Sequence, residues 1–269
     1  MFPTIATVPD QPRVLLVTAT LGRRPEYLDQ TLSSIRSQSV SSDIIIVAPG
    51  DAPGIHQAAK NASATLLDDP GSLVGAVNLG VSHGLANHDY EFVNWLNDDD
   101  LLEPGSLAAT TGLLDTRPEA VAAYGACRYI NDGGHQLFIN KAGPWASRIL
   151  SWGPDLIPQP GMLVRASAWQ QIGGLDPSYS LAFDLDLLLK LKKLGQLADT
   201  GTVVSSFRWH AESLTVDDRR LNIAESERAK RTSLSPRMRR LSWTWEPPVR
   251  IATHLAARLV HRKALRTSS

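Results

Sequence analysis

Three features that would point away from an ordinary intracellular domain are missing from this sequence. A single cysteine, Cys127, excludes an internal disulfide and fits a reducing compartment. No apolar run reaches the roughly 18 residues that a membrane-spanning helix needs. Residues 1–10 contain neither a basic segment nor an apolar core of signal-peptide length. From these absences we expect a cytoplasmic protein.

Net charge is absent as well, but the balance hides a division along the chain. Residues 219–269 contain 13 Lys and Arg against Glu225, Glu227 and Glu246, which gives +10. The rest of the chain therefore carries −10, since the whole chain is neutral. Such asymmetry predicts that the basic tail meets an anionic surface. That surface is either a membrane or the acidic body of the chain itself.

An apolar, strand-like run at residues 92–96 ends at Asn97 and three consecutive carboxylates, Asp98, Asp99 and Asp100. Like charges this close repel by about 1 kcal/mol per pair at 4 Å in water. Oxygen ligands select hard cations, and Mg²⁺ is usually held by one or two carboxylates together with substrate phosphates. The run predicts a divalent-metal site for a phosphorylated ligand. The alternative is a solvated acidic turn in which Asp98 or Asp100 caps the next helix.

Strand-like and helix-like segments alternate through the first part of the chain. Their order predicts a doubly wound, mostly parallel α/β sheet with right-handed crossovers. Ligands bind beyond the carboxyl ends of the strands in such sheets, so we expect three strand ends to converge on one crevice. The predicted strands are 13–20, 43–48 and 91–96, and the predicted helices are 25–38, 74–85 and 105–114.

The second part is less regular and predicts a smaller region of strands and loops. An Asn-Asp-Gly-Gly turn at 131–134 predicts a hairpin between residues 122–131 and 136–139. Further segments are a proline-stiffened loop at 157–161, helices at 167–172 and 181–194, and a strand at 203–209 leading to His210.

Five short motifs in this order resemble those of family-two glycosyltransferases, which have the nucleotide-sugar transferase (GT-A) fold. The resemblance runs from about residue 13 to 213, roughly three quarters of the chain. The motifs are Val-Thr-Ala-Thr at 17–20 with Arg24-Pro25 and the Ser34-to-Gln38 segment, Trp95 to Asp100 with Pro104-Gly105, Pro-Gln-Pro at 158–160 with Arg165 and Gly-Gly-Leu-Asp at 173–176, Asp-Leu-Asp-Leu at 184–187, and the run from Phe207 to Ser213.

The resemblance implies an inverting glycosyltransferase whose domain covers residues 13–218. Its nucleotide-sugar half is expected at about 13–105 and its acceptor half at about 106–218. Residues 1–12 form an N-terminal extension, and 219–269 a basic helical tail.

The roles of individual residues are also implied by the resemblance. Asp99, Asp100 and His210 are the expected ligands of Mg²⁺ or Mn²⁺, and Asp184 the expected general base. The alternatives are a satisfied polar histidine for His210 and a helix-start carboxylate for Asp184. The expected donor-binding residues are Thr18, Thr20, Asp51, Asn78, Asn97, Asp98 and Arg208.

Three of these assignments have their own alternatives. The second strand is followed by Asp51 but lacks the Asp-Asp-Gly-Ser sequence of the family. Asp51, or Asp68 with Asp69, is therefore expected to replace the Asp that recognises the nucleotide base. Asn78 is as consistent with core packing, and Arg208 with an ion pair inside the fold.

The resulting hypothesis is transfer of a sugar from a nucleotide-diphosphate donor to a saccharide or lipid-linked acceptor, in cell-surface polysaccharide or glycolipid assembly. A metal-dependent nucleotidyltransferase and a catalytically silent nucleotide-sugar-binding protein are the alternatives. No nucleic-acid partner is expected. The tail pattern, with Trp243 and Trp245 before an amphipathic segment at 249–265, predicts peripheral binding at the inner face of a membrane.

Overall fold

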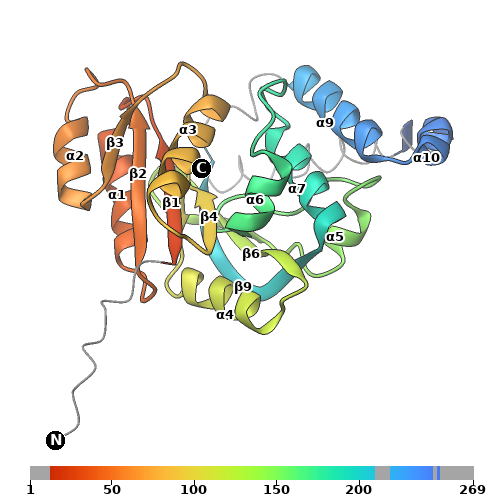
Figure 1. Ribbon diagram of the computed structural model, residues 1–269, viewed down its shortest axis with the longest axis horizontal. Coiled ribbons are helices and arrows are strands. Elements are labelled where there is room, and N and C mark those ends of the chain that lie inside the picture. Colours follow the sequence, from red (N-terminus) through yellow and green to blue (C-terminus); the bar gives the residue numbers. More distant parts are fainter. Residues whose placement is uncertain (1–12, 210–218, 245–246, 249–269) are drawn as a thin grey trace, which may run out of the picture.

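The computed structural model describes residues 13–209, 219–244 and 247–248. Within these residues one sheet of nine strands is covered by helices (Figure 1). The strands are β1 (Val14–Ala19), β2 (Ser42–Ala48), β3 (Thr65–Asp68), β4 (Phe92–Trp95), β5 (Leu101–Leu102), β6 (Ala120–Ile130), β7 (Gln136–Asn140), β8 (Leu163–Arg165) and β9 (Gln196–Arg208). The helices are α1 (Pro25–Arg36), α2 (Ile55–Ala62), α3 (Leu73–Asn87), α4 (Ser106–Thr116), α5 (Ala146–Ile149), α6 (Ala166–Ile172), α7 (Phe183–Leu194), α9 (Arg219–Ser233) and α10 (Pro236–Leu241), followed by the 3-10 turn η1 (Ser242–Thr244).

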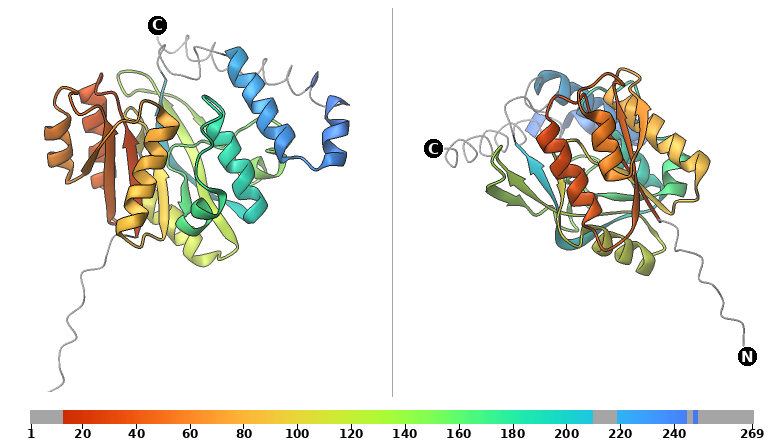
Figure 2. Two further views of the ribbon diagram at one scale, coloured as in Figure 1. Left: turned by 45° about the horizontal axis from the view of Figure 1, so that its top comes forward. Right: turned by 90° about the vertical axis from the view of Figure 1, so that its left-hand side faces the viewer.

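The predicted doubly wound parallel sheet is confirmed. Strands β3, β2, β1 and β4 lie in that order, and each neighbouring pair is parallel. Alternate residues of β1 enter two separate cores: Leu15 and Val17 face α3, while Val14 and Leu16 face α1 and α2. The views in Figure 2 show α1 and α3 on opposite faces of the sheet. Burial on both faces explains why the predicted strand is a continuous apolar run.

Two glycines bring α3 unusually close to β1. A Cβ atom at Gly80 would lie 2.6 Å from Cγ1 of Val17, and one at Gly84 would collide with Leu15. Both residues are one turn apart on the same face of the helix. Their missing side chains let the helix backbone lie directly on the strand, which fixes the position of the sheet edge where β1 ends.

The second part of the chain extends the same sheet. Strand β8 pairs with β4 and β6 in antiparallel fashion, whereas β6 and β9 are parallel to each other. The predicted hairpin is present as β6 and β7. Strand β9 begins at Gln196, well before the predicted start at 203, because its first residues pair with β6 in spite of their polar character.

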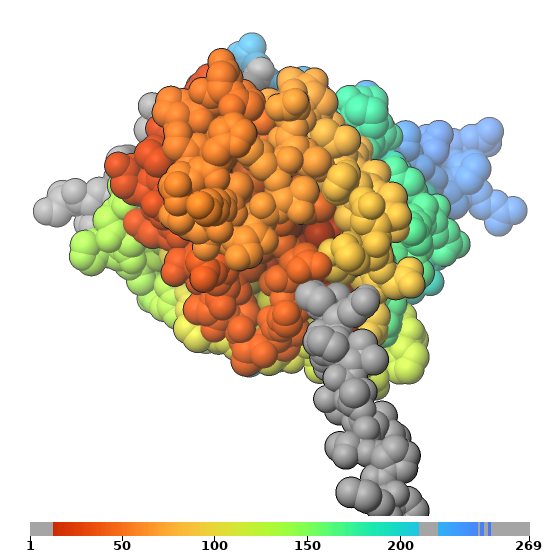
Figure 3. All heavy atoms as spheres, turned by 60° about the vertical axis from the view of Figure 1, so that its left-hand side comes forward, coloured from red at the N-terminus to blue at the C-terminus, as the bar shows by residue number. Residues whose placement is uncertain are grey.

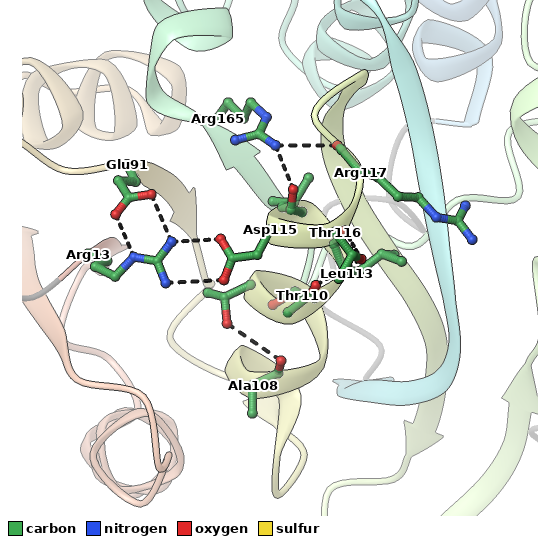
Figure 4. Close-up of polar contacts among 12 residues, drawn as sticks. Arg13, Glu91, Ala108, Thr110, Leu113, Asp115, Thr116, Arg117 and Arg165 are labelled. Atoms are coloured by element: carbon green, nitrogen blue, oxygen red, sulfur yellow. Dashed lines mark hydrogen bonds and ion pairs between the residues drawn. The ribbon is translucent and has the colours of Figure 1, made fainter.

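The amino end of the parallel strands is closed by ion pairs on Arg13 (Figure 4). Its Nε is 2.5 Å from Oε1 of Glu91, and its Nη2 is 2.7 Å from Oδ1 of Asp115 at the end of α4. Arg165 reaches the same helix end, donating from Nη2 to the carbonyl oxygen of Leu114 at 2.7 Å. The start of β1, the residue before β4 and the end of α4 are therefore tied together.

Helix α9, the beginning of the predicted tail, packs against α7 (Figure 2). Ala229 at its centre is buried in the same core as Leu187 and Leu191 of α7. Helix α10 projects from the edge of the body (blue in Figure 3). The predicted amphipathic helix at 249–265 lies outside the described residues. No described helix is long and apolar enough to cross a bilayer.

Candidate active site

A cavity of about 1220 Å³ opens at the carboxyl ends of the parallel strands. Thr20 after β1, Val47 in β2, and Asn97 with Asp98 and Asp99 after β4 line one side. The loop of residues 151–160, the start of α7 and the inner face of α9 line the other. The predicted convergence of strand ends on one crevice is therefore observed.

The carboxylate of Asp98 is held at the cavity wall by Thr20. Thr20 Oγ1 donates to Asp98 Oδ2 and itself accepts a hydrogen bond from the amide of Gly22 at 2.9 Å. Burial raises the pKa of Asp98, and the charge of Asp99 raises it further, against the hydrogen bond from Thr20. Arg24 Nη1 lies 3.8 Å from Asp99 Oδ2. A cation beside these carboxylates would remove part of their repulsion.

Asp100 does not line the cavity. Its side chain is fully buried and accepts hydrogen bonds from Nδ2 of Asn97 and from the backbone amide of Arg208, both at 3.1 Å. Burial and the charge of Asp99 raise its pKa well above the ordinary value. The structure thus places this predicted metal ligand behind the wall, where it joins the end of β4 to the end of β9.

The alternative in which Asp98 or Asp100 caps the next helix is wrong. The residue before α4 is Gly105, which has a φ of +78°, and no side chain caps that helix end. The residues between the carboxylates and the helix instead form β5, which pairs with β9.

Arg208, predicted to contact the nucleotide, is buried and turned into the fold. Its guanidinium lies 4.2 Å from the ring centroid of Tyr27 and donates to the carbonyl oxygens of Asp99, at 3.2 Å, and Asp132, at 3.0 Å. A phosphate contact by this side chain therefore has no support from its position. The position of Arg208 instead fits the alternative of a role inside the fold, although its guanidinium contacts backbone carbonyls where an ion pair was expected.

Three further predicted donor-binding residues lie away from the cavity wall. Thr18 is fully buried within β1, and Asp51 is exposed outside the cavity. Asn78 exchanges two hydrogen bonds with the backbone of Leu175, at 2.8 and 2.9 Å, so its amide holds α3 to the loop after α6. His210 lies outside the described residues. Thr20, Asn97 and Asp98 remain at the site.

Asp184, the predicted base, lines the cavity as the second residue of α7. Its Oδ1 accepts a hydrogen bond from the amide of Leu185 at 2.7 Å, and burial raises its pKa. Asp186, the second carboxylate of the Asp-Leu-Asp-Leu motif, pairs with Lys190 at 2.7 Å and does not line the cavity. The two carboxylates of the motif are thus separated as the helix geometry predicts.

Asp155 is a second carboxylate on this side that the sequence reasoning missed. It lines the cavity from the proline-rich loop, and its Oδ1 accepts from the amide of Ile157 at 3.1 Å. Asp155 is exposed to the cavity. The cavity walls shield its carboxyl from bulk water, and this burial together with the charge of Asp184 raises the pKa of Asp155. Lys230 of α9 lines the same part of the cavity. No spacing in the sequence connects these three positions.

The oxygen atoms at the end of β4 suit a hard cation whose coordination shell is completed by a bound ligand. Asp98 and Asp99 offer only oxygen atoms, which Mg²⁺ and Mn²⁺ accept. Within the described part of the chain, which leaves out His210, no three His, Cys, Asp or Glu side chains come close enough to hold a metal ion alone. The remaining coordination positions would fall to phosphate oxygens and water.

Comparison with solved structures identifies the fold. The chain superposes on TarS residues 1–349 from S. aureus, in complex with UDP-GlcNAc, with a TM-score of 0.61 and 11% identity. It superposes on the mannosyltransferase PcManGT from Pyrobaculum calidifontis, in complex with GDP-Man and Mn²⁺, with a TM-score of 0.58 and 15% identity. The fold is of the GT-A glycosyltransferase type.

The extent of the match differs between these structures. The superposition covers 82% of this chain and 66% of the TarS fragment, which is just under two thirds of that fragment. For PcManGT it covers 95% and 82%. No protein-family model and no curated protein matches the sequence.

Proposed function

We propose that the protein is an inverting glycosyltransferase that moves a sugar from a nucleoside-diphosphate donor to an acceptor hydroxyl. One observation carries the proposal: a single cavity is lined by the carboxylates of Asp98 and Asp99, which follow β4, and by Asp184 at the start of α7. The GT-A-type fold supports it, as do the UDP-GlcNAc and GDP-Man bound by TarS and PcManGT.

Asp99 is the proposed metal ligand, with Asp98 and Asn97 supporting the metal or the ribose. Mg²⁺ or Mn²⁺, when bound, would offset the charge of the departing diphosphate as a Lewis acid. The Mn²⁺ in the PcManGT complex favours a divalent cation. Arg23 and Arg24 line the cavity beside these carboxylates and are suited to contact phosphate oxygens.

Asp184 is the proposed general base. The acceptor oxygen attacks the anomeric carbon, the bond from that carbon to the diphosphate oxygen breaks, and the acceptor proton passes to the Asp184 carboxylate. Its raised pKa brings its basicity closer to the pH at which the enzyme works. Attack on the face opposite the leaving group inverts the anomeric configuration.

The acceptor is proposed to be a saccharide or a lipid-linked saccharide, as in cell-surface polysaccharide or glycolipid assembly. Trp152, Phe207 and Trp209 line the cavity, and flat aromatic rings can pack against the apolar faces of sugars. The cavity carries an indole on each of two segments that are distant in the sequence.

We also propose that the end of the described chain binds an anionic membrane surface. Met238, Leu241 and Trp243 are 42%, 52% and 71% exposed, although they are large apolar side chains. Arg237 and Arg240, beside them, are exposed too. Cationic side chains near an anionic leaflet each contribute about 1 kcal/mol, and exposed Trp and Leu insert at the headgroup level.

Release of nucleoside diphosphate tests the reaction. The protein is incubated with UDP-GlcNAc or GDP-mannose, with Mn²⁺ or with chelator, and free UDP or GDP is measured beside pyrophosphate. Asp99→Ala should lose more than about tenfold in rate, worth about 1.4 kcal/mol, and remain folded. Activity that persists in chelator overturns the metal assignment. Pyrophosphate as the product indicates a nucleotidyltransferase, and binding without turnover indicates a silent binding protein.

Liposome sedimentation tests the membrane surface. Deleting residues 236–269 leaves α9 intact and should release the protein from phosphatidylserine vesicles, whereas binding of the full chain should weaken as salt rises. Trp243→Ala is the matched single change. Equal sedimentation of the full and shortened chains would overturn this part of the proposal.

A further inference from the structure

Helix α9 carries a buried carboxylate, Glu225, in the segment that the sequence predicted to begin the basic helical tail. Its side chain accepts hydrogen bonds from three consecutive backbone amides: Ser180 at 3.0 Å to both oxygens, Leu181 at 2.8 Å and Ala182 at 3.0 Å. The residue is only 7% exposed. Burial raises the pKa of Glu225, but the hydrogen bonds from the three amides outweigh burial and hold it below the ordinary value. Glu225 is therefore a carboxylate at neutral pH.

The three amides belong to the turn that delivers Asp184 to the cavity. Ser180, Leu181 and Ala182 line the cavity themselves, and Ala182 is the residue before α7. No side chain within this turn caps the helix start. The conformation of the turn is thus held by an acceptor from another helix, about 40 residues later in the chain.

Two neighbouring contacts keep α9 in place around Glu225. The Arg228 guanidinium lies 4.0 Å from the ring centroid of Tyr179 and donates to the carbonyl oxygen of Ser178 at 2.6 Å. Lys230 Nζ donates to the carbonyl oxygen of Gly153 at 2.6 Å, two residues before Asp155. One helix therefore binds the two segments that bring Asp155 and Asp184 to the cavity.

We propose that Glu225 is a positioning residue for Asp184. By binding the amides of residues 180–182 it sets where the Asp184 carboxylate lies relative to the acceptor hydroxyl. The inference rests on the proposed function, in which Asp184 accepts the acceptor proton. A displacement of about 1 Å at a reacting group can cost on the order of a hundredfold in rate. The contact also makes residues 219–233 part of the catalytic half of the protein.

The test replaces Glu225 by Gln, which has nearly the same shape but offers one acceptor oxygen in place of two. We expect kcat for UDP or GDP release from UDP-GlcNAc or GDP-mannose to fall at least about tenfold, while the donor KM changes less than about twofold. Glu225→Asp keeps the charge and should recover part of the lost rate.

Ala229→Gly is the matched control, because it loosens the packing of α9 on α7 and leaves the carboxylate in place. It should lower the melting temperature by about 2–4 °C, for a loss of about 1 kcal/mol, with kcat preserved. If Glu225→Gln retains the wild-type kcat, or loses no more than Ala229→Gly does, the inference is overturned.

Amide hydrogen exchange, measured on the same full-length variants, separates this inference from the proposed function. Glu225→Gln should speed exchange at residues 180–185 by more than Ala229→Gly does. If the wild-type protein releases no nucleoside diphosphate, the proposed function fails and the exchange result alone decides. Unchanged exchange at these residues in Glu225→Gln then overturns the positioning role. Faster exchange supports the inference that Glu225 holds the turn in place.

Discussion

The two edges of the parallel strands both carry acidic side chains, but they neutralise them in different ways. At the amino edge, Glu91 and Asp115 share the guanidinium of Arg13 (Figure 4). Hydrogen bonds from Arg13 lower the pKa of both carboxyls. At the carboxyl edge, burial and neighbouring carboxylates raise the pKa of Asp98 and, across the cavity, of Asp155.

The difference shows that carboxylates paired with a cation and carboxylates buried beside other carboxylates lie at opposite edges of the same strands. At the amino edge the ion pairs with Arg13 stabilise the charged carboxylates, and these residues line no described cavity. At the carboxyl edge, burial makes the charged form of Asp98 cost free energy, and in the proposed function a cation would offset that cost. Groups with raised pKa values at a cleft are candidates for catalysis for this reason.

The largest effect that tests the comparison is expected at Asp184. Asp184→Asn preserves shape but cannot accept a proton, so transfer should fall about 10²–10⁴-fold while donor affinity is kept. Asp186→Asn, two residues along the same helix, is the control; because Asp186 pairs with Lys190 outside the cavity, its rate should stay within about twofold of wild type. Loss of donor affinity in Asp184→Asn, in place of lost transfer, would contradict the assignment.

The next effect concerns pH. A base with a raised pKa is protonated and inactive below that pKa, so the rate should rise with pH by up to about tenfold per unit through a range above the ordinary Asp value. Asp155 lines the cavity with Asp184 and interacts with it through its charge, and Lys230 and Glu227 of α9 are further charged residues that line the cavity. Asp155→Asn removes a nearby negative charge and should move the acid limb of the pH–rate profile to lower pH. An unmoved limb would show that Asp155 does not interact with the base.

The smallest effects are on stability, and they should have opposite signs at the two edges. A raised carboxyl pKa in the folded protein costs stability above that pKa, and the cost disappears below the unfolded value. Asp184→Asn should therefore raise the melting temperature at neutral pH by about 2–4 °C, for on the order of 1 kcal/mol.

At the amino edge the sign is reversed, because a lowered pKa stabilises the fold above the unfolded value and the benefit is lost as pH falls through the folded pKa. Asp115→Asn breaks a half-exposed pair, so we expect a loss of about 0.5 kcal/mol, or about 1–2 °C, with unchanged turnover. Thermal melts at pH 7 and pH 3 measure both variants. Shifts of the same sign at pH 7 would remove the distinction between the two edges.

The sequence predicted those elements whose pattern is local. β1 and α1 appear within a few residues of the predicted bounds, because a two-sided apolar strand and a Pro-started amphipathic helix leave periodic signals. Thr20, Asn97, Asp98 and Asp99 were assigned correctly to one crevice, because strand ends in a parallel sheet meet at one edge. Short elements such as β5 and β8 hold too few residues for any period.

The parallel sheet, its carboxyl edge and the acidic residues at that edge could therefore be predicted from the sequence alone. Which of those residues face the cavity depends on tertiary contacts, since the amide of Arg208 draws Asp100 inward. The same packing brings Asp155, from a separate loop, close to Asp184. It also joined the start of the basic tail to the turn before Asp184, through the hydrogen bonds that Glu225 accepts. Contacts between residues far apart in the chain depend on how whole elements pack, and no local periodicity records that packing.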